Sequence, residues 1–129
     1  MSEFLYSQDH QWVLRRGNRV RVGISEFAQE ELGEIAFVEL PPLGRLVTQG
    51  EAVCSLDSLK SSSELYAPVS GRIVETNKLL GDEKNCHLVN SDPLGKGWIF
   101  AIEMSKPGEL EGLLNADSYR ELVQGRESR

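Results

Sequence analysis

The order of apolar and polar positions predicts short strands in the first part of the chain. Apolar and polar residues alternate over 19–24, which is the period-two pattern of a half-buried strand. An apolar segment over 12–14 precedes it, and Gly17-Asn18 between the two favours a tight hairpin. Ser25 is suited to cap a short helix that Gly33 would end.

Further short apolar segments follow at 35–40, 46–47, 52–56, 65–66 and 73–74, with Gly or Pro between them. We expect segments at 88–89 and 98–104 to close the sheet region, which favours a small sandwich or flattened barrel. The expected core includes Val20, Val22, Ile24, Phe37, Trp98, Phe100 and Ile102.

The C-terminal segment from about 107 to 124 is predicted to be helical. Pro107 suits a first helical position, and Ser118-x-x-Glu121 has the pattern of a capping box for the last helix. No linker divides the chain, so we predict a single domain over 1–129, mainly β with short helices and a C-terminal helix.

Composition narrows the function classes. The 129 residues are 40% hydrophobic and carry 20 acidic and 14 basic side chains, a formal charge of −6. The acidic balance argues against nucleic acid, and no apolar run approaches the roughly 20 residues of a membrane span. The N-terminal residues do not have the pattern of a signal peptide, and two cysteines are too few for a disulfide scaffold. We therefore expect a cytoplasmic protein.

Catalytic signatures do not stand out in this sequence. It contains no G-x-S-x-G, P-loop, G-x-G-x-x-G or H-E-x-x-H motif. The spacing of His10, Cys54, Cys86 and His87 gives a metal site no support, so we expect none. These patterns favour a non-catalytic carrier or binding module over an enzyme.

Lys60 occupies the most distinctive polar stretch. It lies between two strand segments, which places its ammonium at a hairpin tip, with Asp57 three residues before it and Glu64 four after. A modifying enzyme needs an exposed lysine on a rigid turn, although most exposed lysines only aid solubility. The residues alone leave both interpretations open.

Four segments carry a resemblance to a known family. They are YSQDHQWV (6–13), VGISEFAQEELGEIAFVEL (22–40), DSLKSSSELYAPVSGRIV (57–74) and LVNSDPLGKGW (88–98). In this order they resemble the H protein of the glycine cleavage system, a lipoyl-carrier family. The resemblance implies a lipoyl-domain fold (a barrel-sandwich hybrid) with its lipoyl hairpin at about 52–75, and lipoate amide-linked to Lys60.

The same resemblance implies partners and a cargo. The arm on Lys60 would carry an aminomethyl group from glycine decarboxylase to an aminomethyltransferase, and a dihydrolipoyl dehydrogenase would reoxidise it. A lipoate ligase or lipoyl transferase would attach the arm. Biotin carriers usually place methionine on both sides of the lysine, whereas Leu59 and Ser61 stand here.

Two departures from the family pattern concern the implied cargo groove. Gln11 stands where the family typically has Glu, and Glu64 where it typically has Asp. The resemblance implies that these residues, with Asp57, line the groove that holds the cationic cargo. A neutral Gln11 brings no charge to such a groove, and it is also consistent with drift at a tolerant surface site.

A second group keeps an alternative open. Lipoate-binding proteins of heterodisulfide-reductase-like sulfur oxidation resemble H proteins but carry sulfur intermediates, and their partner would be that reductase-like complex. Cys54 and Cys86 could be a thiol pair of such a carrier, or could simply fill the core. Glycine cleavage is the leading hypothesis because the matching segments span nearly the whole chain.

Overall fold

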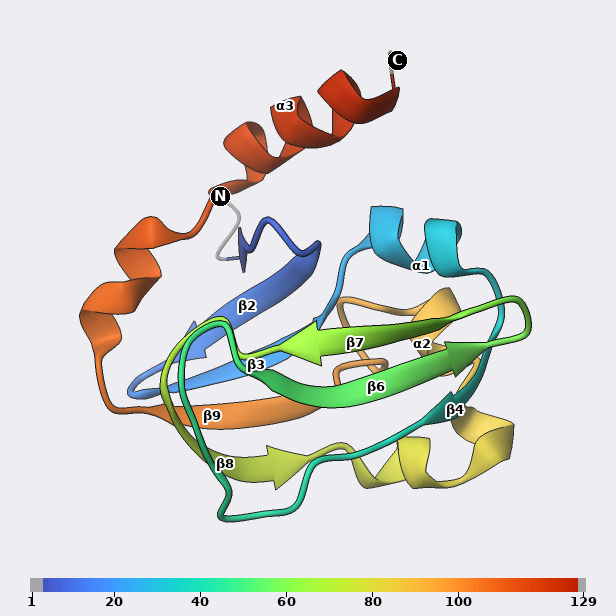
Figure 1. Cartoon of the computed structure of the whole chain (residues 1–129), viewed down its shortest axis with the longest axis horizontal. Helices are drawn as coiled ribbons and strands as arrows, with labels where there is room; N and C mark the ends of the chain where they lie inside the picture. Colours follow the sequence, from blue (N-terminus) through green and yellow to red (C-terminus); the bar gives the residue numbers. More distant parts are fainter. Residues whose placement is uncertain (1–3, 128–129) are drawn as a thin grey trace.

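The computed structural model describes residues 4–127 and shows two antiparallel sheets around one core (Figure 1). The larger sheet has the order β1 (Phe4–Tyr6), β2 (Gln11–Arg16), β3 (Arg19–Ile24), β9 (Phe100–Met104), β8 (Gly71–Thr76), β5 (Leu46–Val47). The smaller sheet has the order β4 (Ile35–Val38), β6 (Ala52–Ser58), β7 (Ser62–Tyr66). Buried residues of both sheets, such as Val22, Ile102, Leu56 and Leu65, share the core. The predicted mainly β class is confirmed.

Short helices lie between the strands or, for the last two, follow the final strand β9. They are α1 (Glu26–Leu32), η1 (Lys78–Gly81), η2 (Glu83–Asn85), α2 (Leu88–Ser91), η3 (Pro107–Gly112) and α3 (Ala116–Glu127). Ser25 caps α1 by accepting a hydrogen bond from Ala28 N at 3.2 Å, and Gly33 ends it at φ +81°, as predicted. Within residues 4–127 no helix has the length and apolarity needed to cross a bilayer.

Two element predictions are wrong. Leu88–Val89 belong to the helical turn α2 and not to a strand. The last helix begins at Ala116, ahead of the expected capping box, because Asn115 Oδ1 accepts the Ser118 N–H at 2.8 Å. The helix also runs past 124 to Glu127, and residues 128–129 lie outside the described part.

Two predicted core residues lie at the surface. Phe37 is 46% exposed, because the pairing of β4 with β6 shifts between Ile35 and Phe37 and turns Ile35 and Val38 inward instead. Trp98 is partly exposed and precedes β9, with the guanidinium of Arg21 4.3 Å from its ring centroid.

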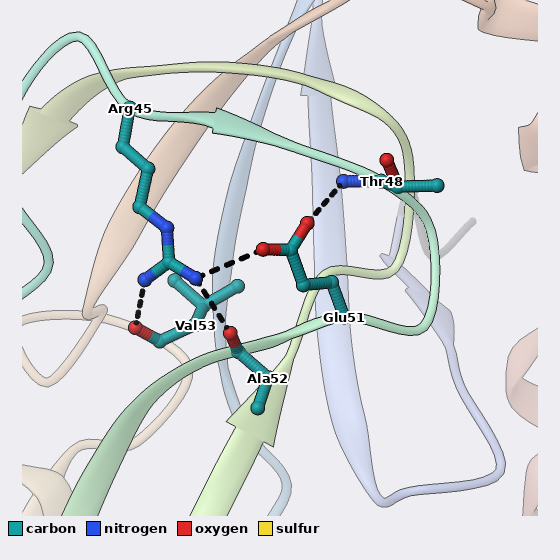
Figure 2. A network of polar contacts seen from close by, with 5 residues as sticks. All are labelled: Arg45, Thr48, Glu51, Ala52 and Val53. Carbon is teal, nitrogen blue, oxygen red and sulfur yellow. Dashed lines mark hydrogen bonds and ion pairs between the residues drawn. The ribbon is translucent and has the colours of Figure 1, made fainter.

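The base of the β6–β7 hairpin is fixed by Arg45. Its guanidinium donates to the carbonyls of Ala52 and Val53, each at 2.9 Å, and to Glu51 Oε2 at 3.0 Å (Figure 2). Glu51 also accepts the Thr48 N–H at 2.9 Å, and the hydrogen bonds from Thr48 and Arg45 lower the pKa of its carboxyl. This clamp holds the start of β6, at the opposite end of the hairpin from its turn.

Candidate functional site

Lys60 lies in the exposed turn that joins β6 to β7, as predicted. The Ser58 side chain organises this turn. Its Oγ accepts the N–H groups of Ser61 at 3.0 Å and Lys60 at 3.3 Å and donates to the Ser61 carbonyl at 3.0 Å. One hydroxyl thus fixes the backbone on both sides of Lys60 while the lysine side chain remains exposed.

The turn is also tied to the segment that follows α1. Leu59 N donates to the Glu34 carbonyl at 3.0 Å. Asn90 of α2 holds the same segment, because its side chain accepts the Ile35 N–H and donates to the Gly33 carbonyl, each at 2.8 Å. In the sequence, Asn90 is marked only as a polar residue beside the apolar pair at 88–89, which does not predict this role.

Gly33 gives the stem of Lys60 room to lie against the backbone. A Cβ built on Gly33 would stand 3.2 Å from Lys60 Cε, tighter than an ordinary contact. Its φ of +81° also disfavours other residues there. The glycine that ends α1 therefore has a second role beneath the lysine.

A pocket of about 160 Å³ opens next to this point, between α1, β7 and the residues before β2. Its polar lining residues are Asp9, His10, Glu31, Ser63 and Glu64. Its apolar lining comprises Ile24, Phe27, Ala28, Leu32, Leu56 and Leu65. Leu32 adjoins Gly33, so the pocket begins beside the residue that the Lys60 stem contacts. Three exposed acidic residues, Asp9, Glu31 and Glu64, thus give the surroundings of this apolar pocket a negative charge.

The C-terminal helix supports one wall of this pocket. His10 has the positive φ of +66°, and its Nδ1 shares a hydrogen bond with Tyr119 Oη at 2.8 Å. The same hydroxyl is 2.7 Å from Ser25 Oγ, the cap of α1, and the Tyr119 ring stacks on Tyr6 at 4.4 Å. Tyr119 therefore joins α3 to two segments that line the pocket, a link the sequence did not reveal.

The predicted groove residues are not brought together. Glu64 lines the pocket, whereas Asp57 accepts the Ser62 hydroxyl at 2.7 Å and is not among the lining residues. Gln11 is 1% exposed, so the interpretation as a tolerant surface site is wrong. Its amide donates to the Tyr66 carbonyl at 2.6 Å and accepts the Tyr66 N–H at 2.7 Å, which links β2 to β7.

Cys54 and Cys86 are both buried free thiols. Burial, reinforced by the charge of Glu39, raises the pKa of Cys54 to about 12, and burial also raises the pKa of Cys86. The Cys86 thiol donates to the Leu80 carbonyl at 3.5 Å. These surroundings support the core-filling interpretation. Among the residues whose side chains the structure describes (4–125), no three His, Cys, Asp or Glu side chains cluster as a metal site would need.

Comparison with known proteins agrees with this geometry. The profile of the family described as Glycine cleavage H-protein matches residues 4–126. The chain is 47% identical over 119 residues to a glycine cleavage system H protein of Thermus thermophilus, covering 92% of this chain and 91% of that protein. It is 48% identical over 122 residues to the H protein of Staphylococcus epidermidis, covering 95% of each.

A solved structure shows the same fold. The crystal structure of a glycine cleavage system H protein from Mycobacterium marinum matches with a TM-score of 0.84 at 35% identity. The match covers 96% of this chain and 98% of that one. The chain belongs to the glycine cleavage H-protein family.

Proposed function

We propose that this chain is a non-catalytic carrier of glycine cleavage, with lipoate amide-linked to Nζ of Lys60 and an aminomethyl group as its cargo. The observation that carries the proposal is the position of Lys60. An exposed lysine stands on a turn pinned by Ser58, beside an anionic pocket, in a chain of the H-protein family.

The surroundings of Lys60 fit an acylated side chain. Among the described residues no hydrogen bond or ion pair involves its ammonium, so amide formation breaks no contact of that group. The stem lies beside Gly33, whose chain neighbour Leu32 lines the pocket. Since the backbone of the turn is fixed, a lipoylating enzyme would meet one geometry.

The chain's own residues then bind and shield the cargo. The bound lipoyl group supplies a dithiolane that opens to two thiols. Glu64, Glu31 and Asp9 attract a cationic amine, and a hydrogen bond to a charged group contributes about 1.5–3 kcal/mol against about 1 for a neutral one. The apolar walls, including Leu32 and Leu56, exclude water from the reacting end.

Glycine decarboxylase, an aminomethyltransferase and dihydrolipoyl dehydrogenase are the proposed partners, with a lipoate ligase or lipoyl transferase to attach the arm. Relatives that share 44–48% identity with the chain are named glycine cleavage system H proteins, which supports this function over sulfur transfer. The free thiols support a reducing, cytoplasmic location.

Intact mass tests the attachment. Expression with lipoate and a lipoate ligase should add one lipoyl group to the wild type and to Lys84→Arg and Lys96→Arg, but none to Lys60→Arg. A lipoyl increment on Lys60→Arg would contradict the proposed site.

Loading tests the cargo. The lipoylated wild type should accept label from glycine carrying ¹⁴C at its α-carbon when glycine decarboxylase is present, and Glu64→Gln should lose the label faster. No loading of a fully lipoylated wild type by an enzyme that loads the T. thermophilus H protein would reject glycine cleavage.

A further inference from the structure

A cluster of arginines stands apart from the acidic character of the chain. Four of its nine arginines lie between 15 and 21, in a chain of formal charge −6. Arg16 pairs with Arg19 across the β2–β3 ladder, and Leu14 pairs with Arg21. Paired residues share a sheet face, as do residues two apart on one strand. Arg16, Arg19 and Arg21 therefore project from the same face, which we call the arginine face.

The three guanidinium groups of the arginine face form no ion pair among the described residues, although Glu75 and Glu103 lie on the same face. Like charges directly opposite in a ladder are destabilising. Among the described residues no carboxylate lies within 4.0 Å of any of these three guanidinium groups. Glu103, which pairs with Arg19 in the β3–β9 register, also forms no ion pair with it. The fold thus keeps an unfavourable arrangement that an external anion would relieve.

The arginine face is concave and partly preorganised. A cavity of about 330 Å³ is lined by the three arginines and Glu75, over Leu14, Val20 and Ala101. Arg21 is held against the Trp98 ring at 4.3 Å, which restricts its guanidinium before any partner binds. Guanidinium groups bind carboxylates in a bidentate manner, and the apolar floor accommodates the methylene groups of an acidic side chain.

The arginine face lies far from the β6–β7 turn that carries Lys60. In Figure 1 the β2–β3 turn is at one end of the long axis, and the β6–β7 turn that carries Lys60 is at the other. A partner seated on the arginine face would leave Lys60 and its neighbouring pocket accessible.

We propose that Arg16, Arg19 and Arg21 form a docking site for an acidic surface segment of a partner protein, whose Asp or Glu side chains enter the cavity between them. Charge complementarity favours this occupant. The protein as a whole has a formal charge of −6 and repels acidic segments, whereas the arginine face attracts them. The inference goes beyond the carrier function and does not require Lys60 to be modified.

Peptide titration of the unmodified protein tests the site directly. An octaglutamate peptide added to ¹⁵N-labelled protein at low salt should shift amide signals of β2, β3 and β9, and the shifts should weaken as salt rises. The variant Arg16→Ser/Arg19→Ser/Arg21→Ser should bind at least tenfold more weakly, whereas Arg120→Ser on α3 should bind as the wild type does.

Stability separates lost binding from lost folding. The substitutions remove the like-charge Arg16–Arg19 pair but also the contact of Arg21 with Trp98, so the triple variant should melt close to the wild-type temperature. Unchanged binding by the triple variant, or shifts that map elsewhere, would overturn the proposal. Tighter binding of a single-stranded oligothymidine of equal charge would assign the face to nucleic acid instead.

Kinetics with the proposed enzymes tests the partner. For at least one of the three enzymes, the triple variant in lipoylated form should show a raised KM with kcat unchanged, and Arg120→Ser should show neither effect. An unchanged KM with every enzyme that turns over the wild type would exclude those enzymes as the docked partner. Failure of the carrier function would appear differently, as no turnover of the wild type itself.

Discussion

Replacing Gln11 by glutamate would establish whether position 11 serves the cargo pocket or the junction between the sheets. Gln11 begins β2, Tyr66 ends β7, and the amide of the first makes two hydrogen bonds to the backbone of the second. A glutamate keeps the acceptor for the Tyr66 N–H. It loses the donor, because Gln11 Nε2 now donates to the Tyr66 carbonyl oxygen at 2.6 Å. In the variant a carboxylate oxygen would face that carbonyl oxygen instead.

The cost of this change should depend on pH. Losing the hydrogen bond and leaving the Tyr66 carbonyl without its partner costs about 1–3 kcal/mol. Burial and the facing carbonyl should raise the pKa of the new carboxyl above its unfolded value of about 4.3. Below that value the carboxyl is protonated in both states and can donate to the carbonyl. As pH rises, the unfolded state deprotonates first, so stability falls by about 1.4 kcal/mol for each pH unit until the folded pKa is passed.

Urea unfolding at pH 4, 5.5 and 7 measures this dependence against the wild type. Gln11→Glu should be the less stable protein at pH 7, and its deficit should shrink toward pH 4. Gln11→Leu is the matched control, since it loses both hydrogen bonds without gaining a charge, and its deficit should stay constant. If Gln11→Glu were as stable as the wild type at pH 7 and released a loaded cargo more slowly, the carboxylate would reach the groove. The assignment of Gln11 to the sheet junction would then be refuted.

Three further outcomes are expected. Tyr119→Phe removes the hydroxyl that contacts His10 and Ser25, so it should lower the free energy of unfolding by about 1–3 kcal/mol. The control Tyr6→Phe should change the free energy of unfolding by less than about 0.5 kcal/mol. Equal effects of the two variants in urea unfolding would contradict the role of the Tyr119 hydroxyl. Ser58→Ala should slow lipoylation several-fold in a timed mass assay, and Ser61→Ala, whose side chain makes none of the hydrogen bonds of the turn, should not; equal rates for Ser58→Ala and wild type would show that the turn needs no such fixing. Iodoacetamide at pH 8 should leave Cys54 and Cys86 unmodified until urea is added, because burial raises the pKa of both thiols. Rapid labelling of the native protein would contradict this protection of the thiols. The stability that the buried Cys54 thiol contributes should be present below its ordinary pKa of 9.0 and be lost as pH rises toward its raised pKa of about 12.

Local signals predicted the elements whose causes are local. The Ser25 cap, the Gly33 end of α1 and the Gly17 turn each depend on the conformational preference of one residue, and each occurs as predicted. The prediction that Phe37 lies in the core was wrong, because a shift in the pairing of β4 with β6 moves the inward face of β4 by one position. Such a shift depends on the partner strand, so it cannot be predicted from the alternation of apolar residues within one segment.

In the candidate site, too, features with local causes could be predicted and features that depend on distant segments could not. Lys60 could be placed because flanking strand segments and small polar neighbours make a hairpin tip. The residues that hold it, Asn90 and Gly33, come from other segments and act through backbone groups, so no spacing along the chain connects them to the lysine. Gln11 is the clearest case, because a polar side chain beside the pocket residue His10 could serve either a cargo or the backbone. The deciding fact is that Tyr66 offers it an N–H and a carbonyl in matching positions. The acidic residues that line the pocket are Asp9, Glu31 and Glu64, so we expect selectivity for a cationic cargo to depend on those three residues rather than on position 11.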